Sequence, residues 1–134
     1  MTHIESNKVA INTNPKQIFD FVLNMNNIIE LLPQEKVENW KGEEDNCSFT
    51  IKGLSGIGMK IDSSEEPTKI AIISHGKNPF DFTMNLHIRE VFENKSEAYL
   101  DFDANMNMMI EMMAKSPLTN LFNIMAEKLK DKFN

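Results

Sequence analysis

A long run of alternating residues between Lys36 and Met106 constrains this chain more than any other feature. Apolar and polar residues alternate there with a period of two, most clearly over 80–89 and 97–106. Successive side chains of a strand point to opposite faces, so this period predicts strands with one buried and one solvated face. Turn-forming residues interrupt the run at 43–46, 53–58, 65–68, 75–79 and 93–96. The segment is therefore predicted to be an antiparallel meander.

Helical signals flank this meander on both sides. A β-favouring stretch over 8–12 precedes residues 14–17, where Asn caps a helix, Pro takes its first position and Gln lies three residues after the cap. A second short apolar turn spans 28–33 and ends at a proline. Near the C-terminus, Ser116 as cap and Pro117 at the first position predict a closing helix of about 16 residues, roughly 24 Å long. Its apolar stripe comprises Leu118, Leu121, Phe122, Met125 and Leu129.

Two stretches carry a family resemblance. They are KVAINTNPKQIFDFVLNMNNIIELLP at the start and NMNMMIEMMAKSPLTNLFNIMAEKL at the end, and they resemble small bacterial members of the START-like (SRPBCC) superfamily, often labelled polyketide cyclase or dehydrase-like. The resemblance covers residues 1–134 as one domain. It implies an α+β helix-grip fold, in which a seven-stranded antiparallel sheet curls around a long C-terminal helix and encloses a cavity. Members range from lipid and hormone carriers to aromatic polyketide cyclases, so this fold does not decide the function.

Charge and composition exclude several classes of partner. Twenty acidic residues against fourteen basic ones give a formal charge of −6, which disfavours attraction to nucleic acid or to an anionic membrane. No run of 18 apolar residues and no signal-like segment occurs, so we expect a cytoplasmic protein without stable membrane insertion. The single cysteine, Cys47, is consistent with a reducing compartment and is expected to be a small buried hydrophobe.

Five of the ten methionines lie between Met106 and Met113. Soft thioethers in this spacing could bind Cu(I), but no cysteine or histidine lies nearby in the sequence. The remaining interpretations are plain core and the flexible lining of an apolar pocket. If the segment is helical, Met108, Met109, Met112 and Met113 share one face, and Glu111 with Lys115 favours that option.

The predicted inward faces of the strands carry no ionisable residue. General acid–base catalysis needs such a group beside the reacting atom, so this pattern argues against an enzyme. We expect no catalytic residue, no metal and no cofactor. A third hypothesis is a cyclase or dehydratase in which His75 or Glu90 is the catalytic group.

The sequence therefore predicts a domain that binds a small hydrophobic or amphipathic molecule, such as a lipid, fatty acid or polyketide-like compound. A protein-interaction module with a filled interior is the alternative, with a homodimer or another protein as partner. A cavity of about 300 Å³ would favour the first hypothesis and a packed interior the second. The predicted cavity-lining residues are Phe82, Met84, Phe102, Met106, Met109, Met113, Leu121 and Met125.

Overall fold

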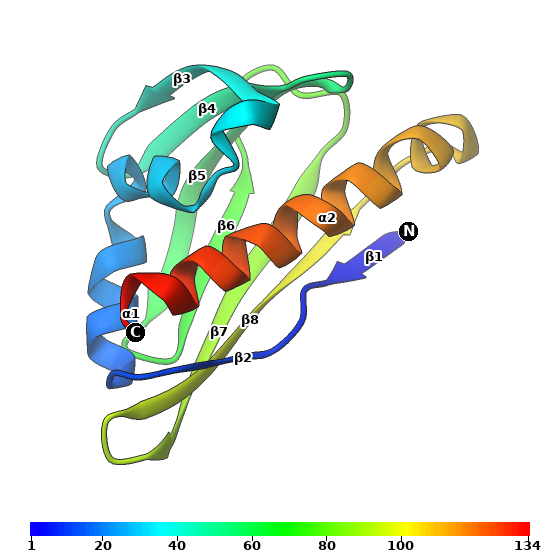
Figure 1. Ribbon diagram of the computed structural model, residues 1–134. Coiled ribbons are helices and arrows are strands. Elements are labelled where there is room, and N and C mark those ends of the chain that lie inside the picture. The colour runs from blue at the N-terminus through cyan, green and yellow to red at the C-terminus, as the bar shows by residue number, and fades with distance from the viewer.

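The computed structural model describes residues 1–134 as one curled antiparallel sheet with a long helix across its concave face (Figure 1). A short N-terminal helix and two 3₁₀ turns close one end. In chain order the elements are β1 (Thr2–Glu5), β2 (Val9–Ile11), α1 (Pro15–Leu23), η1 (Met25–Leu31), η2 (Gln34–Lys36), β3 (Val37–Gly42), β4 (Asn46–Ile51), β5 (Ser55–Glu65), β6 (Lys69–Ser74), β7 (Phe82–Phe92), β8 (Lys95–Ala104) and α2 (Met108–Lys132). The predicted α+β helix-grip class is confirmed.

The sheet has the order β1-β8-β7-β6-β5-β4-β3, so every strand from β3 to β8 pairs with its neighbour in sequence. All five predicted turns lie at the junctions between these strands, although strand residues extend into four of them, most clearly at 53–58, where β5 begins at Ser55. The alternation along β8 is the clearest, because Ala98, Leu100 and Phe102 are buried while the residues between them are only partly buried. Local periodicity thus predicted the buried faces of β7 and β8 correctly, although β7 begins at Phe82 and β8 ends at Ala104.

The β-favouring stretch over 8–12 forms β2, and an unpredicted strand, β1, precedes it, which makes the sheet eight-stranded instead of seven-stranded. Both β1 and β2 pair with β8, but three residues, Ser6–Lys8, face only Tyr99 and Leu100. The extra residue is accommodated because the Ser6 backbone N–H donates to the Leu100 carbonyl at 2.8 Å. The Ser6 hydroxyl in turn accepts from the Leu100 N–H at 2.9 Å. Such a bulge bends a strand, and here it lets the edge follow the curl of the sheet.

The closing helix is longer than predicted. It begins at Met108 instead of Pro117 and has 25 residues, because the Asn107 side chain accepts from the Ile110 N–H at 2.9 Å and caps an earlier start. Pro117 therefore lies inside the helix, where it removes the N–H that would bond to the Met113 carbonyl. The buried positions Ala114 and Leu118 lie on either side of this proline, so packing carries the helix through it.

One continuous hydrophobic core lies between α2 and the concave face of the sheet. It joins 34 buried apolar side chains from all the strands, from α1, η1 and α2, and from the connecting residues Leu32 and Phe80. Phenylalanines fill its centre, with Phe82 stacked on Phe102 at 5.2 Å and Phe102 against Phe122 at 5.0 Å between ring centroids. Neither helix is long and apolar enough to cross a membrane.

Candidate functional site

The interior holds one small, wholly apolar void. It lies between the C-terminal half of α2, helix α1, η1 and the sheet. Its volume is about 20 Å³. That is room for about one water molecule, but no polar group faces it, so the void is expected to be dry. Its thirteen lining residues are Val9, Val22, Ile28, Leu31, Ile72, Met84, Leu86, Ala98, Tyr99, Leu100, Met125, Ala126 and Leu129.

Two of the eight predicted cavity residues, Met84 and Met125, line this void. Phe82, Phe102 and Leu121 are buried in the core but do not line it. Their bulk, together with the rings around Phe102, fills the space beneath the middle of α2. The interior of the protein is therefore packed rather than hollow, which by the volume criterion argues against an enclosed ligand cavity and leaves the surface as the place for a small-molecule site.

The other three predicted residues lie toward solvent: Met106 is half-buried, whereas Met109 and Met113 are exposed. The phase of α2 is the physical reason. A single continuous helix keeps the phase set by its buried C-terminal stripe, so Ala114 and Leu118 take the inward positions. Met109 and Met113 are consequently turned outward and lie outside the void.

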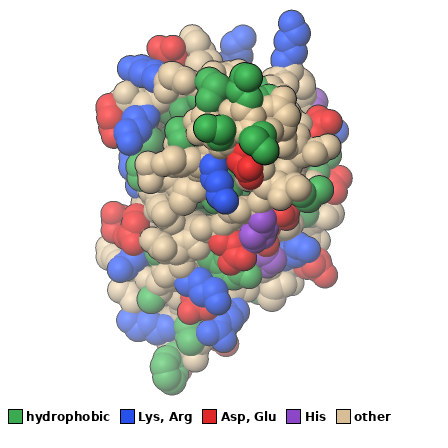
Figure 2. Space-filling model, turned by 90° about the vertical axis from the view of Figure 1, so that its right-hand side faces the viewer, with side chains coloured by type: hydrophobic (Ala, Val, Ile, Leu, Met, Phe, Trp, Pro, Cys, Tyr) green, Lys and Arg blue, Asp and Glu red, His purple; other side chains and the backbone are tan.

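Four methionines form an exposed apolar surface over the first two turns of α2. We call Met108, Met109, Met112 and Met113 the methionine face; their side chains are between 63% and 80% exposed. Figure 2 looks onto the end of the molecule where α2 begins, and hydrophobic side chains gather on its upper part. The helical hypothesis for this segment is confirmed, and helical spacing did predict that the four share a face. Only the packing of α2 decided that this face points outward.

A larger depression lies where α2 meets the β3–β4 end of the sheet. Its volume is about 330 Å³, and we call it the mouth groove. Its lining residues are Pro33, Lys36, Val37, Ile51, Lys52, Ser116, Pro117, Asn120 and Leu121. Val37, Ile51 and Leu121 are buried and form an apolar floor, whereas the lysines, Ser116 and Asn120 are exposed at the rim.

The mouth groove and the void are near neighbours along α2. Leu121 lines the groove and Met125 lines the void, and the two residues are one helical turn apart, a rise of about 6 Å. Leu31, which lines the void, and Pro33, which lines the groove, are also only two residues apart in the chain. Of the groove residues, sequence reasoning had identified only Leu121. The others come from separate segments whose proximity no local pattern indicates.

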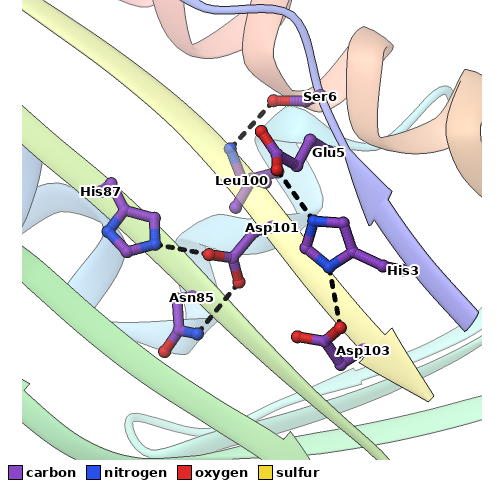
Figure 3. A network of polar contacts seen from close by, with 8 residues as sticks. All are labelled: His3, Glu5, Ser6, Asn85, His87, Leu100, Asp101 and Asp103. Atoms are coloured by element: carbon purple, nitrogen blue, oxygen red, sulfur yellow. Dashed lines mark hydrogen bonds and ion pairs between the residues drawn. The ribbon is translucent and has the colours of Figure 1, made fainter. Parts of the chain in front are cut away.

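Histidines and carboxylates gather on the outer face of the sheet, away from the core (Figure 3). The His87 ring nitrogen Nε2 lies 2.6 Å from Asp101 Oδ2, and the Asn85 amide donates to the other oxygen of that carboxylate at 2.9 Å. The His3 ring lies between two carboxylates, with Nε2 2.8 Å from Glu5 Oε2 and Nδ1 2.7 Å from Asp103 Oδ1. Hydrogen bonds from His3 to Glu5 and to Asp103 raise the pKa of its imidazole. These groups form solvated cross-strand pairs.

The remaining candidates for chemistry lie apart from one another. Cys47 is buried on β4, and burial raises the pKa of its thiol to about 12, so it carries no thiolate nucleophile at neutral pH. The expectation of a buried cysteine is confirmed. His75 is exposed in the loop after β6, and Glu90 is exposed on β7. No group of three or more His, Cys, Asp or Glu side chains is arranged to hold a metal ion.

Comparison with known proteins shows which solved structures share this fold. No family model matches the sequence, and no curated protein is significantly similar to it. Solved structures do match. XoxI from Bacillus cereus superposes with a TM-score of 0.76 at 12% identity, covering 99% of this chain and 96% of that one. A START superfamily protein from Mycobacterium smegmatis has a TM-score of 0.70 at 12% identity, covering 98% and 96%.

The third neighbour is the di-domain ARO/CYC BexL from the BE-7585A biosynthetic pathway, with a TM-score of 0.72 at 8% identity. It covers 98% of this chain and 46% of the BexL chain. At such low identities the likeness concerns the fold and not the activity. The order of elements, the curled sheet and the helix across it agree with this comparison, and the protein has the START-like helix-grip fold.

Proposed function

We propose that the protein binds a small apolar or amphipathic molecule that lies in the mouth groove and extends beneath α2 toward the void. The observation that carries this proposal is the groove itself, about 330 Å³ in volume, with a floor of buried apolar side chains. The all-apolar void lies one helical turn further along α2. The ligand would enter from the groove by repacking Leu121 and the flexible Met125, which line the two spaces on the same helix.

Burial of apolar surface supplies the driving force. A ligand that buries about 400 Å² of apolar surface gains roughly 10 kcal/mol at 25 cal/mol per Å². Association costs at least about 4 kcal/mol in lost translational and rotational freedom. The remaining 6 kcal/mol corresponds to a Kd of tens of micromolar. Apolar contact alone therefore supports modest affinity, and a polar contact at the rim would increase it.

Binding without chemistry is the simpler form of this proposal. The void is lined only by hydrophobic residues, and the only ionisable side chains of the groove are Lys36 and Lys52, exposed at its rim. The histidine–carboxylate pairs lie on the opposite face of the sheet. A cyclase-like reaction would need an acid or base within hydrogen-bond reach of the ligand. We therefore favour a carrier or sensor over an enzyme.

A groove-blocking variant tests the proposal. N-phenyl-1-naphthylamine is a neutral apolar fluorophore, and we expect its fluorescence to rise saturably with the wild-type protein. Asn120→Trp places a large ring in the groove and should weaken this binding at least tenfold. Glu127→Trp is the matched control, since Glu127 is exposed on the same helix and does not line the groove. Absence of saturable binding, or equal binding by both variants, would refute the proposed site.

A second candidate function is an interaction module that uses the methionine face. The observation that favours it is the exposure of four thioether side chains over a packed interior. Methionine surfaces repack readily around a partner. The partner we propose is a second copy of the chain, because an apolar face without charged members is complementary to itself across a twofold axis.

Sedimentation velocity from 10 to 500 µM tests this second candidate. We expect a monomer–dimer equilibrium that is lost in Met109→Gln/Met113→Gln. Met25→Leu is the control. It replaces a buried methionine by a side chain of similar volume, so the monomer–dimer equilibrium should remain as in the wild-type protein. A protein that remains monomeric over the whole concentration range would exclude self-association through this face.

A further inference from the structure

The mouth groove has a charge opposite to that of the whole chain. Its two ionisable residues, Lys36 and Lys52, are both basic, in a protein with six more acidic than basic residues. Glu35 and Glu38 are neighbours of Lys36 in sequence but do not line the groove. A local excess of positive charge beside an apolar floor favours a ligand that is both anionic and apolar.

The backbone holds the two lysines next to each other. The Lys52 N–H donates to the Lys36 carbonyl at 2.9 Å, and the adjoining pair Val37 and Ile51 is in register between β3 and β4. Neither ammonium group makes an ion pair or a hydrogen bond. By contrast, Lys128 donates to the Leu32 carbonyl at 2.9 Å and Lys132 pairs with Glu30 at 3.1 Å. The two rim lysines are therefore free to bind an anion.

The opposite rim supplies neutral donors. Ser116 and Asn120 are four residues apart on α2, so the hydroxyl and the amide lie on the same side of the helix, facing β3 and β4 across the groove. Hydrogen bonds from ammonium groups to carboxylates or phosphates are charge-assisted and about twice as strong as neutral ones. An anionic group at the rim would thus meet lysines on one side and neutral donors on the other.

The apolar side chains beneath the rim, which would repack around a ligand, limit the shape that the ligand can have. From Leu121 in the groove to Leu129 at the far end of the void is eight residues of α2, or about 12 Å. This length and the wholly apolar lining of the void suit a single unbranched chain.

We infer that the ligand is an amphipathic anion: its anionic head group lies between Lys36 and Lys52, and its single apolar chain extends past Leu121 toward Met125. This inference rests on the proposed function, which requires only an apolar ligand in the groove. It adds the chemical class of the ligand and the residues that recognise its head group.

Displacement of N-phenyl-1-naphthylamine by matched ten-carbon ligands tests the inference. Decanoate carries the charge and decanol does not, while the chain is the same. Two exposed charge-assisted contacts correspond to a total effect of about tenfold, so decanoate should displace the fluorophore at about a tenth of the concentration of decanol. Raising NaCl from 50 to 500 mM should reduce this preference, because exposed charges are screened.

Charge-matched variants assign the effect to the two lysines. Lys36→Gln/Lys52→Gln should weaken decanoate binding about tenfold and leave decanol binding unchanged. Lys41→Gln/Lys77→Gln removes the same charge from exposed positions outside the groove and should leave both ligands unaffected. Equal affinities for decanoate and decanol in the wild-type protein would overturn the inference, as would an unchanged preference in the Lys36/Lys52 variant.

Two further outcomes separate the inference from the proposal beneath it. If decanol binds and Asn120→Trp blocks it, but decanoate binds no better, the proposed function stands and the head-group assignment fails. If neither the fluorophore nor decanol binds, both fail. Acetate and inorganic phosphate carry charge without a chain and should not compete at 10 mM; competition by either would identify a simple anion site and refute the amphipathic assignment.

Discussion

Replacing Gly58 with alanine should destabilise the protein because of a close backbone contact. Gly58 lies on β5, and a Cβ atom at this position would lie only 2.2 Å from the carbonyl oxygen of His75. Real Cβ contacts are essentially never under 3.0 Å, so the loop after β6 would have to move by about 1 Å in a close-packed structure.

That displacement strains four hydrogen bonds. His75 N–H donates to the Gly58 carbonyl at 2.9 Å, and the Asn78 side chain accepts from the Gly58 N–H at 3.0 Å. Asn78 also donates to the Gly58 and His75 carbonyls, each at 3.1 Å. Each bond contributes roughly 1 kcal/mol. Because the four bonds would be weakened rather than all broken, the free energy of unfolding should fall by about 3 kcal/mol. For a chain of this size the corresponding fall in Tm is about 10 °C.

Urea denaturation followed by the fluorescence of Trp40, the only tryptophan, measures this change. Trp40 stacks on Phe49 of β4, so its emission reports on the sheet. Gly56→Ala is the matched control on the same strand, since the nearest atom to its Cβ would be 3.9 Å away. Both substitutions reduce unfolded-chain entropy equally. If the two variants unfold at the same urea concentration, the close-approach argument is wrong.

Two other predictions concern exposed groups. On mild peroxide treatment, the methionine face should be oxidised to sulfoxide well before the buried Met25 and Met84, as measured by peptide mass spectrometry; equal rates would place the face in the interior. His3→Gln should lower stability more at pH 5.5 than at pH 8.5, in paired urea titrations. The pKa of His3 is raised in the folded protein by Glu5 and Asp103, so its contribution is complete below the unfolded pKa of 6.5 and is lost as the pH rises through the folded value. The opposite pH trend would contradict these contacts.

The methionine-rich segment shows where helical spacing is informative and where it is not. The spacing of Met108, Met109, Met112 and Met113 predicted a shared face, and the structure confirms it. Whether that face is buried depends on the phase of the whole helix. Ser116 and Pro117 form a strong start signal, but the Asn107 cap and the burial of Ala114 outweigh it. The helix is therefore continuous, and the methionines keep the outward phase.

The sequence alone determined the order of the elements, the turns and the inward faces of the strands. Alternation along 80–89 and 97–106, and the Asn14 cap with Pro15, act between residues close in the chain, where sterics and hydrogen bonding are local. For this reason the curled sheet and the buried positions of Phe82, Met84 and Phe102 were predictable. The likeness of the whole pattern to the START-like fold added the position of the closing helix.

Only the tertiary structure decided how full the interior is and where a ligand can reach it. Phe82, Phe102 and Phe122 fill the centre of the core, and a void of about 20 Å³ remains beside it; both depend on side-chain volumes that meet across distant elements. The mouth groove brings Lys36 and Lys52 opposite Asn120, from segments separated by more than sixty residues in the chain. No local period encodes such a meeting, because it follows from the curl of the sheet and the angle at which α2 crosses it.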